Sequence, residues 1–316
     1  MSVLLFTHKN DIDGMGNVVL AKLAFLSKVD YELCGTFDLT ETVEKRFQDG
    51  TIYDYDYIYV TDLCLEEPVL SKIAEDKNLE GKIEVFDHHK TFAEPKYTDY
   101  EFIKVQVSDD KGLCCGTSLF YQYLVDHHML SPDDKAIKEF VELTRQHDTW
   151  EWKNIYNNEK ARELATLFDV VGCEEYITLM TEKLRQKELE SFEFTTLERT
   201  LINNRLKQIE DKLNFYAENI HYQEILGMKA GIIFIDYEYR NELAEYFKEN
   251  NFDMDFAMMV SLDRGVVSYR SVKDGIHVRP VAEAFGGKGH EKAASNPITN
   301  EMQTEILKVL TKTEKN

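Results

Sequence analysis

The first half of the sequence alternates short apolar runs, typical of buried strands, with helix-like segments. The apolar runs lie at 3–6, 31–37, 57–60 and 83–86, with helix-like segments at about 16–26, 40–47 and 67–76. This alternation with short connections predicts an α/β fold with a mostly parallel sheet and right-handed crossovers. A further strand is expected at 101–107. Because parallel strands run the same way, the residues that follow them gather at one edge of the sheet.

Acidic and imidazole side chains follow three of these runs directly. They are His8, Asp11 and Asp13 after the first run, Asp62 after the third, and Asp87, His88 and His89 after the fourth. A lone Asp-His-His is more often a solvated turn than a ligand set. Here the apolar run ends abruptly in the tripeptide, as expected where a buried strand opens into a site. Three ligand-type side chains in a row point to a metal.

The chain carries a second Asp-His-His, at 126–128, that serves as an internal control. This copy follows an apolar segment at 119–124 that is most simply a helix, and it precedes Ser131-Pro132. Its imidazoles are expected at a helix C-terminus, where cations are favoured and no ligands need converge. Context therefore separates the two copies.

A larger cluster is predicted if Asp148, which follows a helix expected from 132 to about 146, joins the strand-end residues. The set is then oxygen-rich with imidazoles and no thiolate: His8, Asp11, Asp13, Asp62, His88 and Asp148. Such ligands suit Mn²⁺, Mg²⁺ or Fe²⁺ better than a structural zinc. Six side chains are too many ligands for one metal site that keeps positions open for water. Two ions that share a carboxylate would use all six.

Two divalent ions together can ionise a bridging water and neutralise the charge that builds on an attacked phosphorus. The cluster therefore indicates phosphoester or phosphoanhydride hydrolysis. No Gly-x-Ser-x-Gly, Walker A loop or dinucleotide fingerprint competes with this interpretation. The segment Gly116-Thr117-Ser118, at the start of a predicted helix, can either hold a phosphate or act as an ordinary N-cap.

The second half predicts a helical connector and a smaller α/β domain. Residues 158–219 are charged and helical, and a new α/β pattern begins at 228–235 and continues with strands at 256–261 and 266–271. The run Gly286-Gly287-Lys288-Gly289-His290 is a reasonable holder of phosphate or carboxylate. Two domains also suit 316 residues.

Charge and cysteine content limit the partners and the compartment. The 58 acidic and 37 basic residues leave a formal charge of −21, which opposes binding of a long polyanion and favours a short substrate. Five scattered cysteines indicate reduced thiols, and residues 1–8 have neither the pattern of a signal peptide nor that of an anchor. A cytoplasmic protein without membrane contact is expected.

The order of these motifs resembles the DHH-family phosphoesterases that carry the DHH-associated C-terminal domain. The matching pieces span nearly the whole chain: His8-Lys9-Asn10-Asp11-Ile12-Asp13-Gly14, Asp62, Asp87-His88-His89, Asp148, Ser268-Tyr269-Arg270-Ser271, and Gly286-Gly287-Lys288-Gly289-His290 with Ala293-Ala294. The three-residue step from His8 to Asp11 looks like the nanoRNase branch, whereas many relatives have four. Lys288 and Ser295 stand where glycine is usual.

The resemblance implies a role for each matching residue. One Mn²⁺ would be held by His8, Asp11 and Asp62, and the other by Asp13, Asp62, His88 and Asp148, with Mg²⁺ or Co²⁺ left open. Asp62 would bridge, His89 would lie near the scissile phosphate, and Asp87 would support the imidazoles. The other nucleotide or phosphate would be held by Arg270, Gly287, Gly289 and His290.

These expectations combine into a metal-dependent phosphodiesterase of the 3′–5′ exoribonuclease or oligoribonuclease type. It would convert short oligoribonucleotides or linear dinucleotides to mononucleotides. Residues 1–192 would form the catalytic domain, 193–222 the helical connector and 223–316 the substrate-binding domain. The sequence is compatible with a homodimer but does not decide the oligomeric state. The alternatives are hydrolysis of a cyclic dinucleotide, a nucleoside bisphosphate or polyphosphate, and, in another class, a nucleotide sensor without catalysis.

Overall fold

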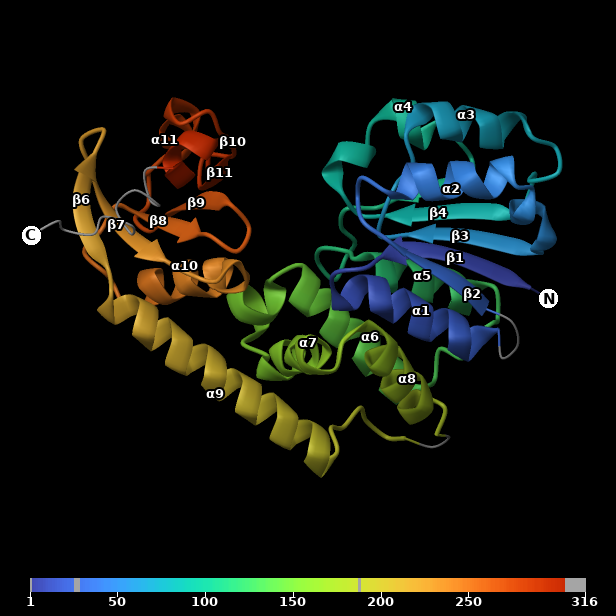
Figure 1. Cartoon of the computed structure of the whole chain (residues 1–316). Helices are drawn as coiled ribbons and strands as arrows, with labels where there is room; N and C mark the ends of the chain where they lie inside the picture. The colour runs from blue at the N-terminus through green and yellow to red at the C-terminus, as the bar shows by residue number, and fades with distance from the viewer. Residues whose placement is uncertain (1, 26–28, 187–188, 305–316) are drawn as a thin grey trace, which may run out of the picture. The chain divides into compact units, whose positions relative to one another are not determined.

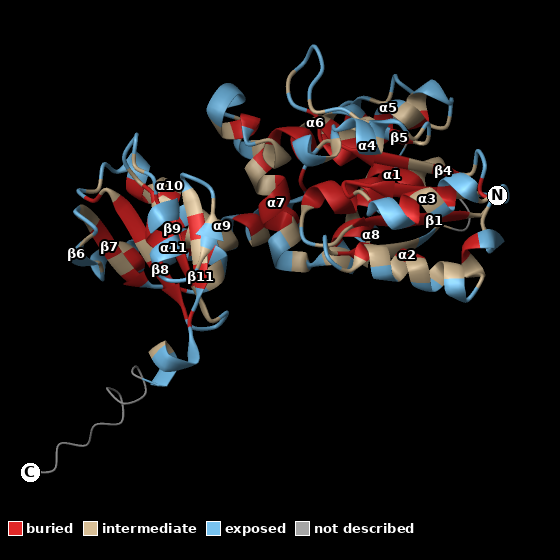
Figure 2. Cartoon of the chain, turned by 90° about the horizontal axis from the view of Figure 1, so that it is seen from above, coloured by how far each residue is buried: buried red, intermediate tan, exposed pale blue. Residues whose placement is uncertain are grey.

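The computed structural model describes residues 2–25, 29–186 and 189–304. The chain forms two compact units, Met1–Asn203 (unit 1) and Asn204–Asn316 (unit 2). In both units the buried residues concentrate in the strands and on the inward sides of the helices (Figure 2). Each unit therefore has a core of its own.

Five parallel strands form the sheet of unit 1, in the order β2-β1-β3-β4-β5 (Figure 1). They are β1 (Val3–His8), β2 (Val29–Cys34), β3 (Tyr57–Thr61), β4 (Ile83–Asp87) and β5 (Ile103–Val105). From β1 the chain first adds β2 on one side and then β3 on the other, so the strand order reverses between β1 and β3. Sites in open parallel sheets lie at the carboxyl ends of the strands beside such a reversal.

Helices cover both faces of this sheet (Figure 1). One face carries α2 (Leu39–Gln48), α3 (Glu67–Glu75) and the short α4 (Pro95–Thr98), and the other carries α1 (Ile12–Ala24) and α5 (Gly116–Asp126). On the first face Phe6 and Ile58 belong to one buried apolar cluster with Val43 of α2. On the second face the ring centroid of Tyr59 lies 5.1 Å from that of Phe120. The α/β fold with a parallel sheet is thus confirmed.

Unit 1 also contains the helices α6 (Lys135–Asp148), α7 (Glu159–Val171) and α8 (Cys173–Leu184). The side chain of Asp134 caps α6 by accepting a hydrogen bond from the backbone N–H of Ile137. Helix α6 packs against α1 and α5. Its last residue, Asp148, is thereby fixed relative to the two helices beside the sheet.

Unit 2 contains a mixed sheet of six strands in the order β10-β11-β9-β8-β7-β6. The strands are β6 (His221–Ile225), β7 (Met228–Phe234), β8 (Phe256–Ser261), β9 (Val266–Ser271), β10 (Lys288–Gly289) and β11 (Ala293–Pro297), and the helices are α10 (Arg240–Glu249) and α11 (Arg279–Ala284). Among the strands that the structure describes in unit 2, only β7 and β8 pair in parallel. The mixed C-terminal sheet is confirmed. Helix α9 (Thr196–Glu218) contains the boundary between the units.

Several element boundaries differ from the sequence prediction. Helix α1 begins at Ile12 instead of Gly16, because Asp11 acts as its N-cap and accepts a hydrogen bond from the N–H of Gly14. Strand β2 ends at Cys34 instead of Phe37, and β6 was not predicted because it is exposed along nearly all of its length. Among the described residues no helix has both the length and the apolar content that a membrane span requires.

Candidate metal centre

Acidic and imidazole side chains from three strands and two helices meet at the carboxyl edge of the unit 1 sheet. His8 and Asp87 end β1 and β4, Asp62 follows β3, and His88 follows β4. The remaining members are Asp11 and Asp13, at the start of α1, and Asp148, at the end of α6. Because the strands are parallel, their carboxyl ends bring together residues that are far apart in the sequence.

One group of potential ligands consists of His8, Asp11 and Asp62, whose ligand atoms lie within 4.8 Å of one another. His8 Nδ1 lies 2.5 Å from Asp11 Oδ2 and 3.7 Å from Asp62 Oδ2. Without a cation the His8–Asp11 hydrogen bond raises the pKa of His8. Two oxygens and one nitrogen around a common point can serve as three ligands of a divalent ion.

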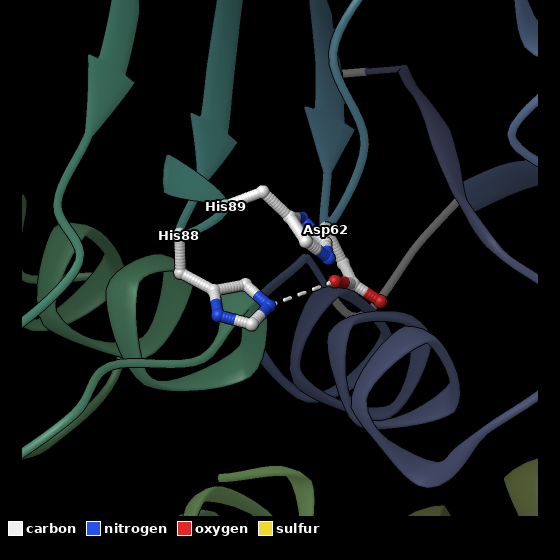
Figure 3. Close-up of side chains that lie close together, drawn as sticks. All are labelled: Asp62, His88 and His89. Atoms are coloured by element: carbon white, nitrogen blue, oxygen red, sulfur yellow. Dashed lines mark hydrogen bonds and ion pairs between the residues drawn. The ribbon is translucent and has the colours of Figure 1, made fainter. Parts of the chain in front are cut away.

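A second group consists of Asp13, His88 and Asp148. His88 Nε2 lies 3.9 Å from Asp13 Oδ2 and 3.6 Å from Asp148 Oδ2. It also lies 3.2 Å from Asp62 Oδ1 (Figure 3). Because Asp62 Oδ2 lies 3.7 Å from His8 Nδ1, Asp62 turns one oxygen toward each of these two histidines. Asp62 is the carboxylate common to both sides of the centre.

The backbone at Asp62 is held in a strained conformation. Its φ is +58°, in the left-handed region that few residues other than glycine adopt. Its N–H donates to the carbonyl of Phe86 over 2.9 Å, and the residue is only 3% exposed. Strain of this kind costs about 1–3 kcal/mol and persists where the surrounding structure fixes it, most often at functional sites.

The N-terminus of α5 fixes Asp13. The N–H groups of Gly116 and Thr117 each donate to one oxygen of the Asp13 carboxylate over 2.7 Å, and the Thr117 hydroxyl donates to the Asp13 carbonyl over 2.6 Å. The sequence left phosphate binding open for residues 116–118. In the structure these two N–H groups bind the carboxylate of Asp13, and Cys115 provides the N-cap instead.

Asp87 orients the two histidines that follow it. Its Oδ1 accepts hydrogen bonds from the N–H groups of His88 and His89, over 2.7 and 3.1 Å, and from Nδ1 of His89 over 2.7 Å. Asp87 itself is fully buried, whereas the His89 side chain is half exposed. Asp87 therefore fixes the backbone of His88 and the ring of His89, and His89 also groups with Asp62 and His88 as potential metal ligands.

The carboxylates of the centre lie close together, and the side chains around them carry too little positive charge to balance theirs. Burial, followed by the neighbouring Asp13 and Asp11, raises the pKa of both Asp62 and Asp148 well above the ordinary value. Burial lowers the pKa of His88 despite its acidic neighbours. Divalent cations would relieve this repulsion, so the arrangement fits a metal centre.

The control triplet lies outside these groups. His127 follows the last residue of α5, and its ring donates from Nδ1 to the carbonyl of Tyr123 over 2.8 Å. Among the described residues, the clusters with metal-ligand geometry include neither His127 nor His128. The prediction that the second Asp-His-His sits at a helix C-terminus is confirmed.

Sequence reasoning missed the network that anchors the end of α6. Arg145 is 4% exposed and donates to Glu151 over 2.5 Å, to the Leu113 carbonyl over 2.8 Å and to Glu142 through two nitrogens. Glu151 also accepts from the Leu113 N–H over 3.1 Å. The network ties the loop before α5 to the residues on either side of Asp148. The local spacing of Glu142 and Arg145 does not reveal this network, because the other two partners, Leu113 and Glu151, lie outside α6.

Replacing Glu151 with glutamine is expected to lower the free energy of unfolding by about 1.5–3 kcal/mol, because a buried, charge-assisted contact is weakened. The exposed Lys135–Glu190 pair offers a matched control, and Glu190→Gln should change stability by less than about 0.5 kcal/mol. Urea unfolding of both variants measures the difference. Equal urea midpoints of the two variants would show that the contact between Arg145 and Glu151 does not stabilise the fold.

The four residues predicted to bind substrate lie together in unit 2. Arg270 of β9 pairs in register with Ala293, whose carbonyl accepts from the N–H of His290. Close backbone approach requires glycine at 287 and 289, since an added Cβ would come within 2.3 Å of the Ser295 carbonyl oxygen and 2.4 Å of Ala294 Cα respectively. These four residues and the acidic cluster therefore belong to different units.

Known proteins resemble the chain in sequence and in fold. Over 299 residues it is 30% identical to oligoribonuclease NrnB of Bacillus subtilis, a match that covers 94% of this chain and 73% of the relative. No family model matches the sequence.

Two solved structures share the fold. A pGpG-specific phosphodiesterase, PggH from Vibrio cholerae, is 12% identical with a TM-score of 0.55, covering 98% of this chain and 97% of that one. The DHH domain of a protein described as a member of a ribosomal protein family is 14% identical with a TM-score of 0.59, covering 98% of this chain and 86% of that one. From the match to the oligoribonuclease and the shared fold, the chain belongs to the DHH phosphoesterase family as a nanoRNase-like member.

Proposed function

We propose that this protein is a metal-dependent phosphodiesterase that hydrolyses short oligoribonucleotides or linear dinucleotides to mononucleotides. The observation that carries the proposal is Asp62, whose two oxygens turn toward separate ligand groups from a strained backbone. The oligoribonuclease relative supports the choice of substrate. The formal charge of −21 favours a short substrate over a long one.

In this proposal the metal centre holds two divalent ions, which we take to be Mn²⁺. One side would be held by His8, Asp11 and Asp62, and the other by Asp13, Asp62, His88 and Asp148. The bound ions would supply an activated water and neutralise charge on the attacked phosphate. The clustered ligand atoms in unit 1 support this assignment.

The other side chains of the proposed site bind and orient the substrate. Asp87 accepts a hydrogen bond from Nδ1 of His89 and thereby raises the pKa of that ring, so protonated His89 can donate from Nε2 to an oxygen of the scissile phosphate. Arg270, Gly287, Gly289 and His290 would hold the rest of the nucleotide. Residues 1–192 would thus be catalytic, 193–222 would connect and 223–316 would bind substrate. The proposed location is the cytoplasm.

A matched panel of substrates tests the proposal. The panel contains a linear diadenylate, a five-nucleotide RNA, a cyclic dinucleotide, an adenosine bisphosphate and polyphosphate, each incubated with Mn²⁺. Stepwise release of mononucleotides from the two linear RNAs is the expected result. Products from only the other three substrates would still support the metal centre, but they would contradict the proposal that the substrate is a short linear RNA. Tight dinucleotide binding without any hydrolysis would indicate a sensor.

Addition of Mn²⁺ to the chelator-treated protein is expected to raise its melting temperature by roughly 5–10 °C. At a concentration 100-fold above Kd, binding contributes about 2.7 kcal/mol, and each kcal/mol shifts the Tm of a unit this size by about 2–4 °C. His88→Ala should remove most of the rise, whereas His127→Ala, in the control triplet, should keep it. Equal responses of the two variants would contradict the assignment of His88 as a ligand.

A further inference from the structure

Two arginines of unit 2 lie close together, Arg270 on β9 and Arg240 at the start of α10. The guanidinium of Arg270 donates to the carbonyl of Tyr269 over 3.0 Å and to Oδ1 of Asn241 over 3.1 Å. Asn241 is the residue next to Arg240, at the start of α10. Burial, and then the positive charge of Arg240, lower the pKa of Arg270. The two cations are therefore neighbours.

This pair differs from most arginines of the chain, which have a carboxylate partner. The paired arginines are Arg46 with Glu32, Arg145 with Glu142 and Glu151, Arg162 with Glu159, Arg199 with Glu193, Arg205 with Glu238, and Arg279 with Glu283. Within residues 2–25, 29–186 and 189–304, Arg240 and Arg270 hydrogen-bond only to carbonyl and amide oxygens. Two guanidinium ions without a counter-charge repel each other, so an anion would complete the arrangement.

The surrounding residues hold both guanidinium groups in place before any ligand binds. The Cζ atom of Arg240 lies 3.9 Å from the centroid of the Tyr237 ring, and its Nη1 donates to the Tyr237 carbonyl over 3.0 Å. Arg270 is fixed by Tyr269 and Asn241. Planar groups that are already oriented lose little freedom when they bind an oxyanion, which increases affinity.

The arginine pair lies next to the glycine-rich loop of the same unit. Arg270 pairs in register with Ala293 of β11, and the neighbouring pair in β11 and β10 is Ala294 with Gly289. We propose that Arg240 is a further substrate-binding residue, and that Arg240 and Arg270 together bind a terminal phosphate monoester of the short nucleotide substrate. This inference rests on the proposed function and deepens it.

The pair favours a monoester over an internal phosphodiester because of charge. A terminal phosphate carries close to two negative charges at neutral pH, and a phosphodiester carries one. Two guanidinium forks match a dianion with several oxygens free to accept. Such a site would therefore select nucleotides that carry a phosphate at an end that is not cleaved.

The test compares Arg240→Gln with Arg264→Gln, a control at an exposed arginine in the turn between β8 and β9. The substrates are diadenylates with a 5′-phosphate, a 3′-phosphate or neither, and the readouts are KM and kcat. Arg240→Gln is expected to raise KM about tenfold or more for one phosphorylated form, with kcat within about twofold and the unphosphorylated form unaffected. Arg240→Lys keeps the charge but loses the two-pronged guanidinium geometry, so its KM should lie between those of the wild type and Arg240→Gln. Thermal unfolding checks the fold.

Two results would overturn the inference. One is a KM for Arg240→Gln equal to that of Arg264→Gln on every substrate, and the other is an equal loss with all three diadenylates. If the wild-type protein cleaves none of them, the proposed function fails, and calorimetric binding of adenosine 5′-monophosphate, with adenosine as control, still tests Arg240. Weaker binding of the monophosphate to Arg240→Gln than to the wild type would support the site, and equal binding would refute it.

Discussion

The variant Asp62→Asn is expected to hydrolyse short RNA at least about a thousandfold more slowly than the wild type. Removing one oriented electrostatic contact typically costs about 10²–10³ in kcat, and Asp62 faces both ligand groups. Asparagine has the same shape and tolerates the left-handed φ of +58°. The loss should therefore reflect charge and not folding.

Initial rates with a five-nucleotide RNA at saturating Mn²⁺ measure this effect. Asp126→Asn, in the control triplet at the end of α5, should keep full activity. The metal-free Asp62→Asn protein should melt no lower than the metal-free wild type, because the substitution removes a buried charge among acids. An activity of Asp62→Asn above about one tenth of the wild-type rate would refute the shared-carboxylate role.

The variant Gly116→Ala is expected to lose about 2–3 kcal/mol of stability and most of its activity, since overpacking of this kind typically costs about 1–3 kcal/mol. A Cβ at this position would lie 2.7 Å from Asp62 Cβ, 2.9 Å from Asp62 N and 3.0 Å from Asp13 Oδ2. The start of α5 would have to move and would weaken the hydrogen bonds to Asp13. Helix propensity alone gives the opposite sign, since alanine is favoured over glycine by up to about 1 kcal/mol.

Gly81→Ala provides the comparison for this substitution. Gly81 has a φ of +71° and open space where a Cβ would stand, so alanine there costs only backbone strain, about 1 kcal/mol. Urea unfolding and initial rates of the two variants separate packing at the metal centre from glycine loss in general. A Gly116→Ala protein as stable and active as the wild type would show that α5 does not fix the centre.

The sequence predicted the sheet-edge residues because their position follows from topology. His8, Asp62 and His88 end or follow strands that run parallel, so any fold with those strands brings them together. The sequence also distinguished the two Asp-His-His copies correctly, because one lies at the end of a strand and the other at the end of a helix. Asp148 depended on the family resemblance, because an acid after a helix has no local signal of its own.

Contacts between distant segments were not predictable from local patterns. The hydrogen bonds from Gly116 and Thr117 to Asp13 join residues 103 and 104 positions apart. A helix N-terminus offers N–H groups to any anion, so the sequence could not distinguish a phosphate from a carboxylate of the chain itself. Arg240 was missed because its significance lies in its neighbours Tyr237 and Arg270, and not in a motif.

The most direct test of the central claim is a time course of a five-nucleotide RNA with the chelator-treated protein, before and after Mn²⁺ is restored, with products separated by length. The account predicts intact RNA without the metal, stepwise accumulation of mononucleotides once it is added, and no products with Asp62→Asn under either condition. RNA that stays intact in the presence of Mn²⁺, or that is cut equally well without it, would contradict the account.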